Sequence, residues 1–167
     1  MTTIAFKDGI MASDSCISGS GFFAASVPKV LRTSAGALIG WSGEADNRAV
    51  LALLDKVKNP KSLPTKQEIA ACQTEFDLLI AFGPNQVYNV TCDEDNGRYT
   101  GYVTLANLGF AATGSGWALA TGAMLAGKSA RDAVMIACKV DRFSKLPVHA
   151  LSFEPKIPTK KPKPKPK

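Results

Sequence analysis

Thr2, the residue after the initiator methionine, is of a type that can act as a nucleophile. Threonine is small enough for removal of Met1 to be expected, and removal would leave Thr2 with a free α-amino group. That amine has an unperturbed pKa of about 7.7–8.0, so it can serve as a base near neutral pH. A threonine hydroxyl activated by its own terminal amine is a known catalytic arrangement. It requires a rigidly held terminus, and a strand that starts at residue 2 would hold it.

Other side chains with catalytic or metal-binding chemistry are few. There is no Gly-x-Ser-x-Gly elbow, and a Ser-His-Asp triad would have to use the single histidine, His149. His149 lies in an apolar stretch and is expected to be an ordinary strand residue. The four cysteines, Cys16, Cys72, Cys92 and Cys138, are far apart in the sequence. We therefore expect reduced, mostly buried thiols, no metal site and no cofactor in this chain.

The positive net charge of the chain, +6, comes from its C-terminal end. Six of the 20 lysines and arginines lie in residues 155–167, and all 14 acidic residues lie at or before Glu154. A basic groove on the folded body is therefore not indicated. Residues 158–167 alternate proline and lysine, which predicts a disordered tail over 154–167 because proline favours extended backbone and like charges repel. The functional alternative is weak, salt-sensitive attraction to nucleic acid or to an acidic partner surface.

The elements that must position Thr2 begin with a hairpin. Residues 2–7 and 10–18 have strand character and flank Asp8-Gly9, a strong two-residue turn signal. Residues 27–34 and 37–43 predict a second hairpin, and the stretch 19–26 between the two is expected to be a loop of small residues. Apolar residues at helical spacing predict a helix over 44–59. A second helix is predicted over 65–76, starting with a Thr65–Glu68 capping box.

Strands and helices then alternate in blocks to the end of the body. Strands are predicted over 76–93, 101–114 and 148–153, and helices over 114–127 and 129–141, the last with Ser129 as its N-cap. Such blocks favour the α+β class. The continuous apolar run at 77–82 fits a strand buried on both faces, which predicts two sheets stacked between two helix layers. We expect one domain over residues 1–153, without a transmembrane helix or signal peptide, in the cytoplasm.

Five motifs follow one another along the chain. They are the threonine-first hairpin TTIAFKDGIMASDS, the lysine strand VPKV, the glycine-ended strand IGWSGEAD, the turn and helix pair ATGSGWALATGAMLAG and SARDAV, and DRFS as Asp-x-x-Ser. Together, in this order, they resemble the proteasome β-subunit family of N-terminal nucleophile (Ntn) hydrolases. The resemblance is nearest to HslV-type peptidase subunits, including small HslV-like proteins of phages, and covers most of residues 2–153. It implies a four-layer α-β-β-α sandwich.

By this resemblance Thr2 would be the nucleophile and its amino group the general base. Lys29 would lie beside Thr2, where its cation favours a deprotonated oxygen, and Asp14 would keep that lysine charged and oriented. Gly43 would offer its backbone N–H to the developing oxyanion. Each residue also has an ordinary alternative, since Asp14 could end a strand in a turn and Lys29 could be a solvated strand residue.

The resemblance also implies a polar network that fixes the amine, formed by Ser115, Asp141 and Ser144. Ser115 would be a good helix N-cap on its own, and Asp141 could be an ordinary loop acid. The Asp-x-x-Ser motif departs from the family because it continues into Lys145-Leu146 instead of Gly-Gly. Trp41, two residues before Gly43, is expected to point to the same face and to form the floor of the substrate pocket.

The resemblance implies a threonine endopeptidase subunit that degrades unfolded proteins. Its copies would assemble as stacked hexameric or heptameric rings around an inner chamber, fed by an AAA+ unfoldase on a separate chain that uses ATP. In a virus the compartment would be the host cytoplasm. Two alternatives stay open from the sequence. One is a catalytically inactive assembly protein with the same fold, and the other is a nucleic-acid-associated protein that acts through its basic tail.

Overall fold

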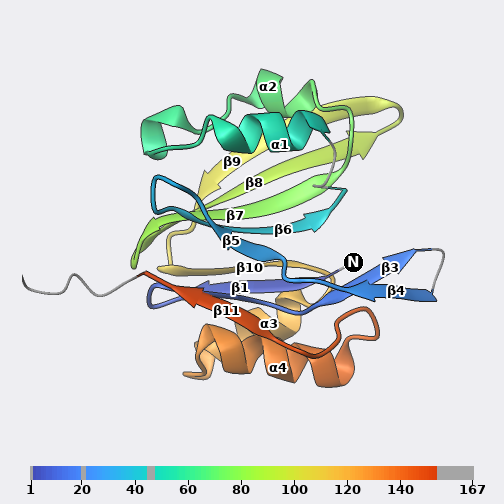
Figure 1. Ribbon diagram of the computed structural model, residues 1–167, viewed down its shortest axis with the longest axis vertical. Coiled ribbons are helices and arrows are strands. Elements are labelled where there is room, and N and C mark those ends of the chain that lie inside the picture. The colour runs from blue at the N-terminus through green and yellow to red at the C-terminus, as the bar shows by residue number, and fades with distance from the viewer. Residues whose placement is uncertain (1, 20–21, 45–47, 154–167) are drawn as a thin grey trace, which may run out of the picture.

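The computed structural model describes residues 2–19, 22–44 and 48–153. Met1 and the predicted tail, residues 154–167, lie outside the described residues. The described chain forms two larger antiparallel sheets, a two-stranded ribbon and helices (Figure 1). No helix in the described part has the length and apolar character needed to cross a bilayer.

The first sheet contains the strand that follows Thr2. Its strand order is β10-β1-β2-β11, with every neighbouring pair antiparallel. The β1–β2 turn is Asp8-Gly9, as the sequence predicts, and both residues have positive φ, 51° and 76°. The four strands are β1 (Thr3–Lys7), β2 (Ile10–Ser13), β10 (Phe110–Gly114) and β11 (His149–Ser152).

The second sheet is a five-stranded antiparallel meander in chain order, β5-β6-β7-β8-β9. The strand predicted over residues 101–114 is in fact two strands in different sheets, because β9 ends at Leu105 and β10 begins at Phe110. The strands of the meander are β5 (Val30–Arg32), β6 (Leu38–Gly43), β7 (Phe76–Gly83), β8 (Gln86–Asp95) and β9 (Arg98–Leu105).

The chain between the two sheets differs from the prediction. The strand expected over 10–18 ends at Ser13, and the expected loop over 19–26 pairs back as a ribbon of β3 (Cys16–Gly19) and β4 (Phe22–Ser26). The interruption at Asp14 and Ser15 has a local cause. The Asp14 side chain accepts the Cys16 N–H at 2.8 Å, which turns the chain out of the first sheet.

The helices begin where the capping signals predict. Thr65 and Glu68 form the predicted capping box, and the Ser129 side chain accepts the Asp132 N–H. The second helix is shorter than predicted, since Ala71 is its C-cap and Gln73 turns to positive φ. The helices are α1 (Arg48–Asp55), a 3₁₀ turn η1 (Pro60–Ser62), α2 (Lys66–Ala70), α3 (Trp117–Leu125) and α4 (Ala130–Val140).

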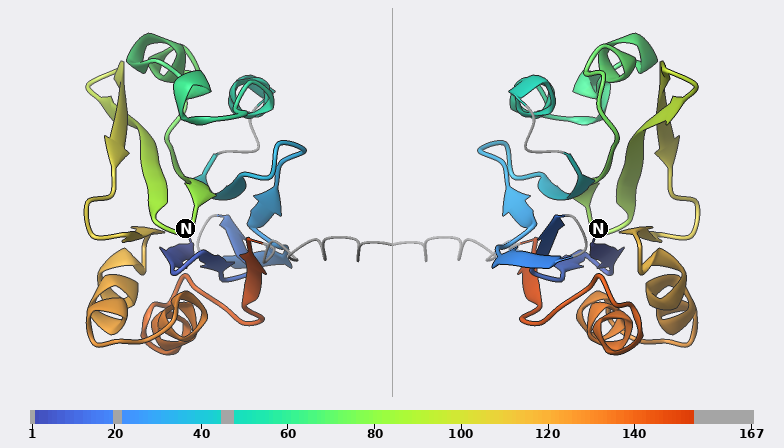
Figure 2. Two further views of the ribbon diagram at one scale, coloured as in Figure 1. Left: turned by 90° about the vertical axis from the view of Figure 1, so that its left-hand side faces the viewer. Right: turned by 90° about the vertical axis from the view of Figure 1, so that its right-hand side faces the viewer.

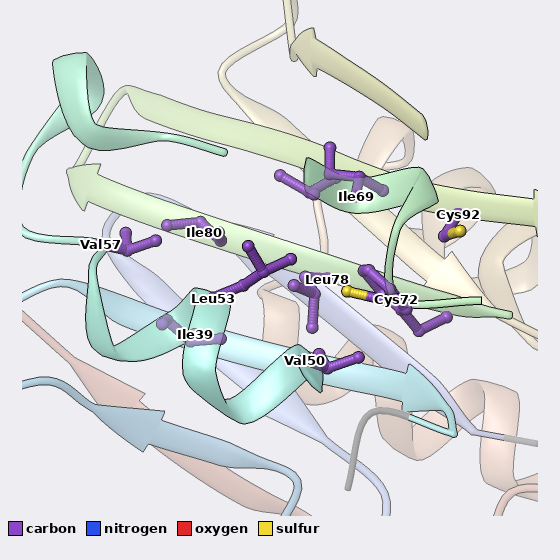
Figure 3. Close-up of a cluster of buried hydrophobic side chains, with 11 residues drawn as sticks. Ile39, Val50, Leu53, Val57, Ile69, Cys72, Leu78, Ile80 and Cys92 are labelled. Atoms are coloured by element: carbon purple, nitrogen blue, oxygen red, sulfur yellow. The ribbon is translucent and has the colours of Figure 1, made fainter. Parts of the chain in front are cut away.

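The core consists of three apolar clusters. Figures 1 and 2 show α1 and α2 over the outer face of the five-stranded sheet, and α3 and α4 over the outer face of the four-stranded sheet. Figure 3 shows the cluster between α1, α2 and their sheet, which includes Leu53, Leu78 and Cys72. A second cluster lies between the sheets, where Phe6 meets Leu79, and a third lies under α3 and α4.

Strand β7 shows why its sequence is a continuous apolar run. Leu78 and Ile80 belong to the cluster on the helix side, whereas Leu79 and Ala81 belong to the cluster between the sheets. Both faces of β7 are therefore buried, as predicted. The α+β class is confirmed, with two antiparallel sheets and helices on their outer faces.

Candidate active site

Thr2 lies in the buried interior at the start of β1 and is 2% exposed. The next residue, Thr3, is opposite Gly114 of β10 in the sheet register. Gly114 has φ +84°, and a Cβ built on it would lie 2.2 Å from the Thr2 carbonyl oxygen. A side chain at position 114 would therefore displace Thr2, so this glycine permits the close approach of the two strands.

Lys29 and Asp14 form a buried ion pair next to Thr2. The Lys29 ammonium donates to Asp14 Oδ1 at 3.1 Å, and the two side chains are 5% and 0% exposed. The same ammonium donates to the Thr2 hydroxyl oxygen and to the Cys16 carbonyl. The cation thus lies against the hydroxyl oxygen that the sequence predicts to be the nucleophile, and a cation in this place stabilises negative charge on such an oxygen.

The Asp14 carboxylate is satisfied by four donors. Besides Lys29 it accepts the backbone N–H of Thr3 at 3.0 Å, of Cys16 at 2.8 Å and of Lys145 at 3.1 Å. Burial of a carboxylate is tolerated when its oxygens are paired and hydrogen-bonded in this way. Asp14 therefore orients the lysine and also fixes the backbone on both sides of the site.

A second polar group surrounds Asp141, the C-cap residue of α4. Asp141 Oδ2 accepts the hydroxyls of Ser115 at 2.7 Å and Ser144 at 2.6 Å. Ser115 also lies 3.2 Å from the Thr2 carbonyl oxygen. Burial raises the pKa of the Asp141 carboxyl, but the hydrogen bonds from Ser144, Ser115 and the Phe143 N–H outweigh it and bring this pKa below its ordinary value. Asp141 is therefore ionised at neutral pH.

Gly43 ends β6 with φ +76°, and a Cβ there would lie 2.6 Å from the Glu75 carbonyl oxygen. The strand is tied to the Lys29 segment, because the Trp41 N–H donates to the Lys29 carbonyl at 3.1 Å. The Trp41 side chain packs against the cluster under α1 and α2. Its role in a substrate pocket stays a prediction.

The structure thus brings together Thr2, Asp14 and Lys29, and joins them to Ser115, Asp141 and Ser144. The sequence did not single out Thr3, whose hydroxyl oxygen lies 2.6 Å from Ser144 Oγ, or the Lys145 N–H, which donates to Asp14 Oδ2 at 3.1 Å. Spacing could not reveal either contact, because each joins residues more than 100 positions apart. A hint was available in Gly114 and Gly116, which flank Ser115 and approach β1 closely.

Gly122 to Ser129 has the spacing of a phosphate loop, Gly-x-x-x-x-Gly-Lys-Ser. Such a loop must follow a strand and open a helix, whereas here its first half lies in α3. The carbonyls of Met124 and Lys128 accept hydrogen bonds from Lys7. This match therefore carries no phosphate site. Within the described residues, no three or more histidine, cysteine or acidic side chains gather where they could bind a metal ion.

The fold is similar to proteasome-related structures. A structure of Thiobacillus denitrificans BPH in complex with epoxomicin matches 92% of this chain and 99% of its own, with TM-score 0.55 and 22% identity. Anbu (ancestral beta-subunit) from Yersinia bercovieri matches 92% of this chain and 84% of its own, with TM-score 0.58 and 10% identity. The helical assembly of the Anbu complex from Pseudomonas aeruginosa matches 92% of this chain and 81% of its own, with TM-score 0.51 and 12% identity.

These comparisons correct the narrower family assignment. No family model matches the chain, and no curated protein matches its sequence. The identification as an HslV-type or small phage HslV-like peptidase is wrong, because the structural matches are to BPH and Anbu and their low identities support the fold alone. The motifs misled because short motifs of this kind do not separate one subfamily of a fold from another.

Proposed function

We propose that this chain is a threonine peptidase in which Thr2, which becomes the N-terminal residue when Met1 is removed, is the nucleophile. The observation that carries the proposal is the contact between the Lys29 ammonium and the Thr2 hydroxyl oxygen inside a buried ion pair. Burial of a lysine cation and a carboxylate costs desolvation free energy, so such a pair is a poor device for stability alone. A nucleophilic hydroxyl beside the cation gives the pair a chemical role, because the cation stabilises the oxygen as it loses its proton.

The reaction would proceed in two stages. The Thr2 α-amino group takes the hydroxyl proton as Oγ1 forms a bond to the substrate carbonyl carbon, and the Gly43 N–H stabilises the resulting oxyanion. The carbon–nitrogen bond then breaks, and the amino group gives its proton to the leaving amine. Water, deprotonated by the same amino group, hydrolyses the ester and regenerates Thr2. Ser115, beside the Thr2 carbonyl and Asp141, would position the amine throughout.

The wider proposal includes fold and assembly. We equate the observed order of helices, sheet, sheet and helices with the four-layer sandwich of Ntn hydrolases, on the strength of the similarity to BPH and Anbu. The helical assembly formed by Anbu supports self-association of this chain as well. Hexameric or heptameric stacked rings, unfolded-protein substrates and a separate ATP-driven unfoldase complete the proposal.

The first test is whether Thr2 becomes the N-terminus and reacts. The intact mass and N-terminal sequence of the purified protein should show loss of Met1. A peptide vinyl sulfone, which captures a nucleophilic oxygen by addition, should then add the mass of one inhibitor per chain. Epoxomicin, bound in the BPH structure, should compete with this labelling.

The variant Thr2→Ala should lose labelling and peptide hydrolysis while it keeps the wild-type unfolding midpoint. Thr91→Ala is a matched control, since its hydroxyl bonds to Asp77 at 2.8 Å in the second sheet, away from Thr2. It should label like the wild type. Retention of Met1 on the assembled protein, or equal labelling of Thr2→Ala, would reject the peptidase proposal.

A further inference from the structure

Thr3 is buried, and its backbone N–H, its carbonyl and its hydroxyl each have a hydrogen-bond partner. It is 0% exposed, and its N–H donates to Asp14 Oδ1 at 3.0 Å. Its carbonyl accepts the Asp14 N–H at 3.1 Å, and its hydroxyl oxygen lies 2.6 Å from Ser144 Oγ. Residue 3 therefore touches both polar groups of the site, the ion pair of Asp14 and Lys29 and the hydroxyls around Asp141.

The direction of the Thr3–Ser144 hydrogen bond follows from its neighbours. Ser144 has a single hydroxyl proton, and this proton is directed to Asp141 Oδ2, which only accepts. Ser144 must then accept from Thr3, so the Thr3 hydroxyl is the donor. The result is a directed chain from Thr3 through Ser144 to the Asp141 carboxylate, and hydrogen bonds in such a chain reinforce one another.

The peptide group between Thr2 and Thr3 is held through its N–H, which donates to Asp14 Oδ1. Thr3 supplies a second anchor through its hydroxyl, 2.6 Å from Ser144 Oγ. A peptide plane fixed at its N–H and by the next side chain leaves the preceding residue little freedom of orientation. The preceding residue here is Thr2, so its orientation is fixed.

We propose that Thr3 is a positioning residue that links the two polar groups and fixes the Thr2 nucleophile beside Lys29. This inference rests on the proposed function, since it assigns Thr3 a part in the same site. It acts through the Thr3 hydroxyl and not through its methyl group, whose removal leaves every hydrogen bond of the site in place.

The test compares two variants that differ by one hydroxyl. Thr3→Ser keeps the donor and Thr3→Ala removes it, and neither adds an atom to a crowded site. With peptide vinyl sulfone as the probe, the maximal labelling rate of Thr3→Ala should be about tenfold below that of Thr3→Ser, because one net hydrogen bond corresponds to about that factor. The half-saturating probe concentration should not change. The control pair Thr91→Ser and Thr91→Ala should differ by less than about twofold.

A second measurement does not depend on activity. Hydrogen exchange of the peptide that contains β1, read by mass spectrometry, should be about tenfold faster in Thr3→Ala than in Thr3→Ser after correction for intrinsic rates. Equal labelling and equal exchange of the two variants would overturn the role of Thr3. If the wild type with a free Thr2 is not labelled, the peptidase proposal fails, and the exchange rates still decide whether Thr3 anchors the terminus.

Discussion

At the level of single residues, the site depends on a charge that the fold keeps out of water. Lys29 is 4% exposed, and Asp14 accepts its ammonium together with three backbone N–H groups. Each partner makes burial of the other tolerable, so the pair is a unit. Burial, with the charges of Asp14 and Asp141, raises the pKa of the Cys138 thiol to about 11, which disfavours the thiolate form that reacts as a nucleophile.

Variants of Lys29 and Asp14 can separate the effect of the pair on unfolding free energy from its effect on the reactivity of Thr2. Lys29→Met leaves the Asp14 carboxylate buried without its cation, and loss of one partner of a buried pair costs about 3–5 kcal/mol of unfolding free energy. The double variant Lys29→Met/Asp14→Asn removes both charges, but the new amide NH2 faces a backbone N–H that the carboxylate accepted, so it should recover only part of that loss in urea unfolding. Labelling of Thr2 should be lost in both proteins. Recovery of labelling together with stability would show that Lys29 acts on the fold alone.

At the level of elements, the start of α3 is built against β1. Gly116, the N-cap of α3, lies so near β1 that an added Cβ would be 2.0 Å from the Thr3 hydroxyl oxygen and 3.1 Å from Ala137 Cβ. The packing of α3 on the first sheet therefore needs a residue without a side chain at this point. Gly122, within the same helix, has nothing within 4 Å of the corresponding position.

Substitution by alanine should change the unfolding free energy in opposite directions at Gly116, the N-cap of α3, and at Gly122 within the helix. Gly116→Ala forces α3 or Thr3 to move, and overpacking of this kind costs about 1–3 kcal/mol. The displaced Thr3 hydroxyl should also slow Thr2 labelling. Gly122→Ala fills open space and should stabilise the helix by about 0.5–1 kcal/mol. Urea unfolding measures both, and a Gly116→Ala protein with unchanged stability and labelling would contradict the close packing.

The sequence predicted the elements best where local chemistry decides them. The Asp8-Gly9 turn, the capping box at Thr65 and the N-cap at Ser129 are all formed as expected. The β3–β4 ribbon was missed because β2 ends where the Asp14 side chain accepts the Cys16 N–H, a side-chain turn that the alternation of residues does not reveal. The motifs predicted which side chains come together at the candidate site. They did not predict that the backbone N–H groups of Thr3 and Lys145 donate to Asp14.

At the level of the whole molecule, the body and the charged end of the chain are separable. The three apolar clusters draw on residues up to Phe153, which packs against the cluster between the sheets. The charge has the opposite distribution. Deletion of residues 154–167 removes six lysines and Glu154, which lowers the net charge from +6 to +1. Stability and attraction to polyanions should therefore reside in different parts of the chain.

Deletion of residues 154–167 tests this separation. The shortened chain should keep the unfolding midpoint and the Thr2 labelling rate of the full chain, because no described contact of the core or site needs the deleted residues. The full chain should bind single-stranded DNA weakly at low salt. If all six lysines contact phosphates, each doubling of salt should weaken binding by about 16–20-fold, and the shortened chain should not bind measurably. DNA binding that survives the deletion would place the contact on the folded body instead. Loss of labelling in the shortened chain would mean that the basic segment supports the active site.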